Sequence, residues 1–205
     1  MLRTVGVLVL SVAIALTMLV TPASAVPADS SPPSAGRSER HATTSARRVV
    51  PYSVTTRGAV PASMEVFRRQ AQETYDDPRG WRAGGVRFRR VRRGGDFTLV
   101  LASAGAVPSF SPSCSAAWSC RVGRFVIINQ YRWRHASVAW NSAGRSIRDY
   151  RHLVVNHETG HWLGLGHASC PRRGDKAPVM MQQSKGTGGC RLNPWPLPRE
   201  ADRIR

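Results

Sequence analysis

The sequence is poor in acidic residues and in lysine. Its 205 residues contain 12 Asp and Glu against 30 Lys and Arg, which gives a formal net charge of +18, and only Lys176 and Lys185 are lysines. The positive electrostatic field of such a chain attracts acidic polymers such as nucleic acid, anionic lipid or acidic cell-wall material. A GC-rich coding bias also produces an excess of Arg over Lys, so the charge alone assigns no partner.

Long apolar runs are scarce, and the one long run lies at the N-terminus. Residues 1–25 begin with a single charge at Arg3, continue through an apolar stretch over 5–20 and end in small residues up to Ala25. This order predicts a secretory signal peptide cleaved after Ala25 and therefore a secreted protein. The alternative is an uncleaved N-terminal membrane anchor, for which the run is short against a bilayer core of about 30 Å. No later stretch is apolar enough to span a membrane.

Large apolar side chains are almost missing from residues 26–48, which are rich in Ser, Pro, Ala and Arg. Such a segment cannot bury enough surface to offset the entropy of ordering it, so we expect a disordered linker. The folded domain is expected to span residues 49–205.

Cysteine is limited to four residues, all in the expected domain: Cys114, Cys120, Cys170 and Cys190. An even count in an exported chain favours two disulfides with three possible connectivities. Proximity in sequence favours Cys114–Cys120 and Cys170–Cys190. A structural zinc site made of cysteines is the alternative, but no C-x₂₋₄-C pair is present.

The remaining pattern predicts an α/β fold in which helices pack on one sheet. Residues 86–93 alternate Arg with Val86, Phe88 and Val91, which is typical of the solvated face of a half-buried strand, so dedicated nucleic-acid binding is not expected. The expected elements are an edge-tolerant strand at 49–56 containing Pro51, a helix from Pro61 to before Pro78, two strands at 86–92 and 96–103 with a hairpin-like or bulged connection at "RGG", a strand centred on 126–128 and a second long helix over 146–166.

The stretch "NHETGHWLGLGH", residues 156–167, predicts a metal site. His157 and His161 are four residues apart, so on a helix both imidazoles lie on one face and can approach one zinc ion. Glu158 lies beside them and can act as a general base toward a water at the metal. Gly164 permits a left-handed turn that brings His167 back as a third ligand. Three protein ligands leave a fourth position open, as in catalytic zinc sites; a purely structural zinc and a helix with incidental histidines are the alternatives.

The segment "HETGHWLGLGH" resembles the zinc signature of the metzincin metallopeptidases, with the matrixin branch most similar. The resemblance implies that His157, His161 and His167 bind zinc and that Glu158 is the general base. In "APVMMQQ", Met180 or Met181 would form the methionine turn beneath the metal, and we favour Met180. The resemblance also implies a twisted mixed sheet that carries a long helix and an active-site helix. The motifs "NHETGH", "CP", "APVMMQQ" and "NPWP" resemble, over residues 49–198, a family of secreted actinobacterial proteins with this signature.

The chain departs from the metzincin pattern after the methionine turn. Only about two dozen residues follow, with three prolines, so we expect the long C-terminal helix of many metzincins to be absent or very short. A Cys170–Cys190 bridge would clamp the methionine loop in its place. The predicted function is a secreted zinc-dependent endopeptidase acting on a peptide or protein substrate. The alternative is a non-catalytic cell-wall or polyanion-binding protein on the same scaffold, which would not need Glu158.

Several polar and aromatic residues are weaker candidates. Of the histidines outside the motif, we expect His41, His135 and His152 to lie at the surface. We expect Tyr131 and Tyr150 to pack in the core or at the surface rather than donate to an oxyanion. Trp118 is expected to line a substrate groove, and Trp162 is expected to pack on the sheet.

Overall fold

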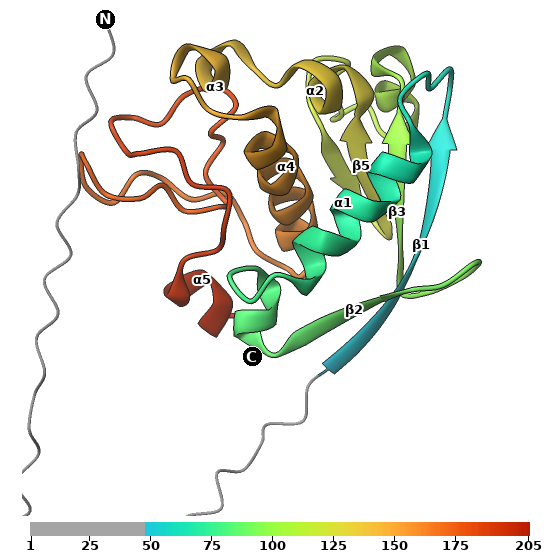
Figure 1. Cartoon of the computed structure of the whole chain (residues 1–205), viewed down its shortest axis with the longest axis horizontal. Helices are drawn as coiled ribbons and strands as arrows, with labels where there is room; N and C mark the ends of the chain where they lie inside the picture. Colours follow the sequence, from blue (N-terminus) through green and yellow to red (C-terminus); the bar gives the residue numbers. More distant parts are fainter. Residues whose placement is uncertain (1–47) are drawn as a thin grey trace, which may run out of the picture. The chain divides into compact units, whose positions relative to one another are not determined.

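The computed structural model describes residues 48–205, in which helices and strands form one α/β unit (Figure 1). The predicted signal peptide, residues 26–47 of the predicted linker and His41 lie outside the described residues, whereas Arg48, the last residue of that linker, begins β1. The elements are β1 Arg48–Arg57, α1 Met64–Asp76, the 3₁₀ turn η1 Trp81–Gly84, β2 Val86–Arg90, β3 Phe97–Ala102, the 3₁₀ turn η2 Ala104–Phe110, β4 Cys120–Val122, β5 Phe125–Asn129, α2 Gln130–His135, α3 Val138–Ser142, α4 Ile147–Trp162 and α5 Pro198–Asp202.

The sheet has five strands in the order β2-β1-β3-β5-β4. The first four in this order are parallel, and only β4 runs antiparallel, against β5. The predicted α/β class with a mixed sheet is therefore confirmed. The alternation in β2 is confirmed too, since Val86 and Phe88 are buried while Arg87, Arg89 and Arg90 face solvent.

The predicted hairpin between β2 and β3 is wrong. Both strands are parallel to β1 and lie on opposite sides of it. β2 accompanies β1 from Arg48 to Tyr52, and β3 accompanies it from Tyr52 onward. The chain between them therefore crosses over β1, close to where Figure 1 shows β2 passing it. At the crossing a Cβ on Gly95 would lie 2.8 Å from the carbonyl oxygen of Pro51, so glycine is required for close backbone approach and not for a hairpin turn.

The first strand is interior in the sheet order and not at its edge as its proline suggested. Pro51 is nevertheless tolerated because the ladder with β2 occupies one side of β1 and the ladder with β3 begins only at Tyr52. At Pro51 the second side of the strand has no ladder partner, so the missing N–H breaks no ladder hydrogen bond there.

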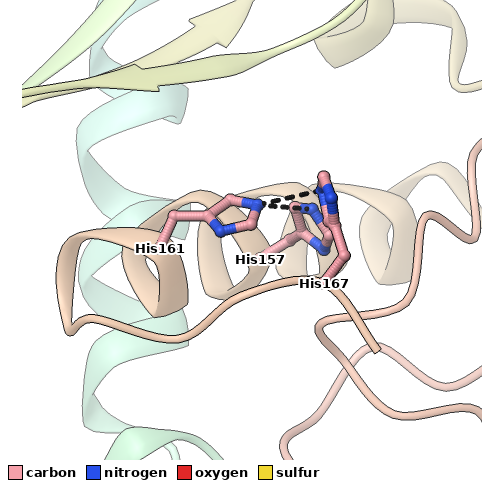
Figure 2. A group of neighbouring side chains, drawn as sticks. All are labelled: His157, His161 and His167. Carbon is pink, nitrogen blue, oxygen red and sulfur yellow. Dashed lines mark hydrogen bonds between the residues drawn. The ribbon is translucent and has the colours of Figure 1, made fainter. Parts of the chain in front are cut away.

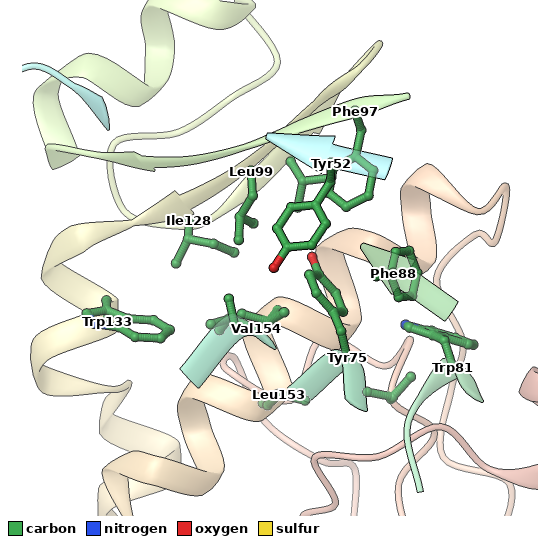
Figure 3. Packing of buried hydrophobic residues seen from close by; sticks show 14 of the residues in the cluster. Tyr52, Tyr75, Trp81, Phe88, Phe97, Leu99, Ile128, Trp133, Leu153 and Val154 are labelled. Carbon is green, nitrogen blue, oxygen red and sulfur yellow. The ribbon is translucent and has the colours of Figure 1, made fainter. Parts of the chain in front are cut away.

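The predicted helices occur as α1 and α4, and both have side-chain caps. Ser63 accepts a hydrogen bond from the backbone N–H of Val66, and Ser146 accepts one from that of Asp149. The two helices contact each other and the same face of the sheet. Figure 3 shows the core between these layers, in which most of the labelled aromatic rings gather at one end and Trp133 lies at the other. Tyr52 stacks on Phe97 with ring centroids 5.3 Å apart, and the hydroxyl of Tyr75 lies 2.9 Å from that of Thr159 in α4.

The opposite face of the sheet carries a smaller apolar cluster. Val100 and Ile127 point there, and η2 covers them together with the loop closed by the Cys114–Cys120 disulfide. The second disulfide joins Cys170 to Cys190, so both bridges follow the pairing that sequence proximity favoured.

The chain after α4 contains little regular structure. It has one isolated bridge, Lys176 with Arg191, and ends in α5, which has 5 residues. The expectation of a very short C-terminal helix is confirmed. Within the described residues, no helix has the length and apolar character needed to cross a membrane.

Candidate metal centre

Helix α4 carries the first two histidines of the motif on its last two turns. His157 and His161 lie on one face, and the Nε2 atoms of the two rings are 3.2 Å apart (Figure 2). The Nε2 of His167 is also 3.2 Å from that of His161. Two nitrogens bound at about 2.0–2.1 Å to a tetrahedral ion are separated by roughly 3.3 Å. The three rings are therefore arranged as ligands of one metal ion.

The second nitrogen of two of these rings is held by a backbone carbonyl. Nδ1 of His157 lies 2.8 Å from the carbonyl oxygen of Val179, and Nδ1 of His161 lies 2.8 Å from that of Leu165. An N–H on each Nδ1 donates to the carbonyl, which leaves Nε2 as the unprotonated, ligating atom. Backbone oxygens thus fix both the tautomer and the ring orientation.

The turn after α4 brings the third histidine back to the first two. Leu165 N–H donates to the carbonyl of Gly160, and Gly164 N–H donates to that of His161. Together these bonds form a Schellman motif with Gly164 as the left-handed residue, at φ +95°. The predicted role of Gly164 as the turn glycine agrees with this geometry. The chain then reverses and carries His167 to the open side of the pair.

Met180 lies directly beneath the histidine helix. It is 2% exposed, and its sulfur packs so closely on Gly160 that a Cβ there would collide with it. Met181, in contrast, is half-buried and lines a cavity described below. The backbone N–H of Ala168 donates to the carbonyl of Met180, which ties the third histidine to the methionine segment. Of the two methionines, Met180 therefore has the position expected of the turn residue.

A buried carboxylate that sequence reasoning missed holds this segment. Glu200, 5% exposed in α5, accepts hydrogen bonds from the backbone N–H groups of Val179 and Met180, each at 2.9 Å. It also accepts one from Leu197 N–H at 2.8 Å. Since Val179 presents the carbonyl that orients His157, Glu200 positions a candidate ligand indirectly. The residues "PREAD" only indicate a helix start, and nothing in them points to the metal site.

Glu158 lies beside the ligand cluster with its side chain turned into the same cavity. Burial raises the pKa of its carboxyl to about 8, an effect that the nearby Arg121 opposes. Burial also lowers the pKa of His157 to about 3, and the positive charges of His161 and His167 would add to that effect. The ring of His157 is therefore neutral at physiological pH, which is the form that binds a metal ion.

The candidate site opens into a cavity of about 380 Å³. Its floor is formed by α4, one side by the loop and strand from 113 to 121, and another by the segment 181–185. Each disulfide bridge closes a loop that contributes to this lining. The rim of the cavity is therefore built from covalently restrained loops.

Two of the weaker candidate residues line the same cavity, and the others lie outside it. Trp118 lines it, as expected for a groove aromatic, and the guanidinium of Arg132 lies 4.5 Å from its ring centroid. Tyr150 also lines it, with its hydroxyl 2.8 Å from that of Ser184. Tyr131 is 55% exposed and packs beside His135, away from the histidine cluster. Trp162 packs against Phe97 of the sheet, as predicted.

The prediction that His152 lies at the surface is wrong. It is 6% exposed, and its Nδ1 lies 2.8 Å from the hydroxyl of Thr74 in α1. Its ring centroid is 4.8 Å from that of Trp195 in the C-terminal segment. The neighbouring arginines Arg148 and Arg151 suggested exposure, but His152 occupies the face of α4 that turns toward α1 and "NPWP".

These features define an α/β protein with a three-histidine site suited to a divalent metal ion. Three neutral imidazoles suit zinc, copper, iron or nickel, and three protein donors beside an acidic residue and an open cavity fit zinc in particular. The chain belongs to the family described as "Protein of unknown function (DUF3152)", whose pattern matches residues 35–189.

Comparison with curated proteins gives no match. Among solved structures, the archaemetzincin of Methanopyrus kandleri is similar at 16% sequence identity and a TM-score of 0.46, over 80% of this chain and 96% of that chain. At this identity and score the likeness supports no conclusion about fold or activity.

Proposed function

We propose that the protein is a secreted zinc-dependent endopeptidase. The observation that carries the proposal is the convergence of His157, His161 and His167 on one point, with the carboxyl of Glu158 in the same cavity. A site of three imidazoles with a neighbouring carboxylate is the arrangement that metal-assisted hydrolysis requires.

The three histidines would hold the zinc ion, which supplies Lewis acidity toward a carbonyl oxygen and lowers the pKa of water. Glu158 accepts a proton from the attacking water and passes it to the leaving amine. The backbone carbonyls of Val179 and Leu165 keep two imidazoles oriented throughout. Glu158 lines the cavity together with the three histidines, so a peptide bound there would lie close to all four side chains.

Export is supported by the two disulfides, because such bonds persist in oxidising compartments. The sequence of residues 1–25, with its charged start, apolar run and small residues, supports the same conclusion.

The alternative is a non-catalytic cell-wall or polyanion-binding protein. The exposed arginines of β2 favour it, since they present a basic surface away from the histidine cluster. The buried carboxyl of Glu158 favours the enzyme, because burying an acid without an ion pair costs stability and a binding protein gains nothing from it.

The experiment compares the purified protein with Glu158→Gln, using a quenched peptide library and zinc quantification in both. We expect one zinc ion in each protein and a loss of turnover of roughly 10²- to 10⁴-fold in the variant, since the general base is removed. Glu65→Gln, at a carboxylate whose side chain is 87% exposed, is the matched control and should retain full activity. Zinc binding without turnover in the wild type would favour the binding protein; absence of zinc binding would exclude the zinc peptidase.

A further inference from the structure

The cavity beside the candidate metal centre has an uneven charge. Glu158 is the one acidic residue in its lining, whereas Arg121 and Lys185 contribute two cations from separate segments. Apart from the histidines and the buried Gln183, the other polar side chains of the lining are neutral and able to donate hydrogen bonds: Ser113, Ser115, Ser119, Tyr150, Gln182 and Ser184. The lining therefore offers donors and positive charge to whatever enters.

Both cations lack acidic partners. Seven ion pairs occur within residues 48–205, and none of them involves Arg121 or Lys185. Six arginines elsewhere in the same region are paired with carboxylates, whereas Arg121 and Lys185 belong to the majority of its cations that are not, so both are available to an anionic ligand.

The backbones that carry the two cations are fixed. Arg121 lies in β4, immediately after the Cys114–Cys120 bridge, and pairs in register with Val126 of β5. Lys185 follows Gln183, whose buried amide group bonds to the carbonyls of Pro178 and Asn193 and accepts from the Asn193 N–H. Charges on fixed backbones are partly preorganised, so a ligand has less ordering to bring about on binding.

The two cations reach the candidate metal centre from different segments. Arg121 lies in β4 and Lys185 in the segment after Met181, and both line the cavity together with Glu158 and the three histidines. An anionic group in the cavity would therefore lie near both charges and close to the Glu158 carboxyl.

We propose that the cavity selects peptides with a carboxylate next to the bond that is cut, and that Arg121 and Lys185 determine this specificity. The inference rests on the proposed peptidase function for its cleavage step. The carboxylate can come from an Asp or Glu side chain or from a free C-terminus, because one guanidinium and one ammonium group recognise either. Cationic peptides are disfavoured by the same charges.

The first test measures cleavage. A quenched peptide library with each central position fixed in turn as Glu, Gln or Lys is cut by the wild type, Arg121→Gln, Lys185→Gln and the double variant. We expect kcat/KM to follow the order Glu above Gln above Lys at one position, and each single variant to reduce the Glu-to-Gln ratio roughly threefold to fivefold. Arg89→Gln, on the exposed face of β2, is the matched control and should leave the ratio unchanged.

The second test measures binding without turnover. The ¹⁵N-labelled zinc protein carrying Glu158→Gln is titrated with acetyl-Ala-Glu-Ala-amide, acetyl-Ala-Gln-Ala-amide and acetyl-Ala-Ala-Ala with a free C-terminus. We expect the two carboxylate peptides to shift the amide signals of residues 121 and 185, with Kd values several-fold below that of the Gln peptide. The double variant should abolish this difference, and added salt should weaken it. Comparison of the two carboxylate peptides identifies which source is preferred.

The two tests separate the specificity from the activity. A binding preference for carboxylate without cleavage of any peptide would refute the peptidase and support the anion-selective cavity. Equal binding of Glu and Gln peptides, or a preference that survives in the double variant, would overturn the inference even if peptides are cleaved.

Discussion

The two regions that supply the candidate metal ligands are built by different interactions. His157 and His161 belong to α4, whose inward face packs into the apolar core between the sheet and α1. His167 and Met180 belong to the segment 163–197, which has almost no helix or strand. Apolar burial stabilises the first region. The second region buries Val179 and Met180 against the same core, but its path is determined by hydrogen bonds, many of them from side chains to the backbone.

In the second region, polar side chains form hydrogen bonds with backbone groups that have no partner in a helix or sheet. The amide of Asn193 donates to the carbonyls of Ala177 and Trp195, and that of Gln183 bonds to Pro178 and Asn193. Glu200 bonds to three backbone N–H groups, and the Cys170–Cys190 bridge closes the segment. The comparison suggests that changes in the first region mainly alter stability, whereas changes in the second alter the geometry of the third ligand.

The largest effect is expected in the first region. Leu99→Ala removes a fully buried side chain from β3, so the free energy of unfolding should fall by about 2–5 kcal/mol. Zinc affinity of the folded protein should stay within a few-fold of the wild type. Urea unfolding and zinc competition titrations measure the two quantities, with Val138→Ala, at a 79% exposed side chain, as the control. A large loss of zinc affinity in Leu99→Ala would contradict the expectation that changes in the first region mainly alter stability.

In the second region, Glu200→Gln should lower both the free energy of unfolding and the zinc affinity. The amide can accept from fewer of the three N–H groups, and its NH₂ faces a donor, so we expect a loss of about 1–3 kcal/mol of stability. Zinc affinity should fall by on the order of tenfold, because the carbonyl that orients His157 shifts. Asp202→Asn, on the same helix with its side chain 56% exposed, should change neither. Loss of stability without loss of affinity would mean that Glu200 does not position the ligand.

The turn that joins the regions gives a smaller, local effect. Gly164→Ala places a Cβ at φ +95° with nothing within 4 Å, so its cost of about 1–2 kcal/mol is conformational and not steric. Gly166→Ala also meets open space, but at an ordinary φ, and is therefore a matched control. We expect only the first substitution to weaken zinc binding. Equal effects at the two glycines would argue against the Schellman turn as the device that positions His167.

The smallest effect concerns His152, which lies between α1, α4 and the C-terminal segment. Burial, followed by the charge of Arg148, lowers its pKa below the ordinary 6.5, while Asp149, Asp77 and Glu73 oppose the shift. The unfolded chain then binds the proton more readily, so this residue's contribution to stability is full above about pH 6.5 and is lost as pH falls below it.

Unfolding at pH 7.5 and 5.5 tests this expectation in the wild type and in His152→Gln. The decrease in unfolding free energy should be smaller in the variant, by at most about 1.4 kcal/mol, because pH 5.5 lies one pKa unit below the ordinary 6.5 of the unfolded imidazole. His135→Gln is the control for loss of a histidine at an exposed position. Identical pH dependence in His152→Gln and the wild type would show that the buried imidazole does not contribute.

The comparison also explains which features the sequence predicted. The two long helices, four of the five strands, the histidine pair and the turn glycine follow from periodicity and local spacing, because the interactions that form them are local. The short elements β4, α2 and α3 were not predicted. The crossing of β1 did not follow, since "RGG" has the composition of a hairpin turn and only the contact of Gly95 with Pro51 reveals its role. Glu200, Arg121 and Lys185 were missed because they reach the site from segments distant in the sequence, where no spacing rule applies.

The crossing at Gly95 has a mechanical consequence. β1 is the first strand of the described chain, and one continuous piece of chain lines both of its sides, with β2 along its first half and β3 along its second. A pulling force applied at Arg48 would act along β1 and shear both ladders together, so their hydrogen bonds must fail collectively and not one after another. Tension on the N-terminal side would therefore be resisted by the sheet before it reached α4 and the histidines.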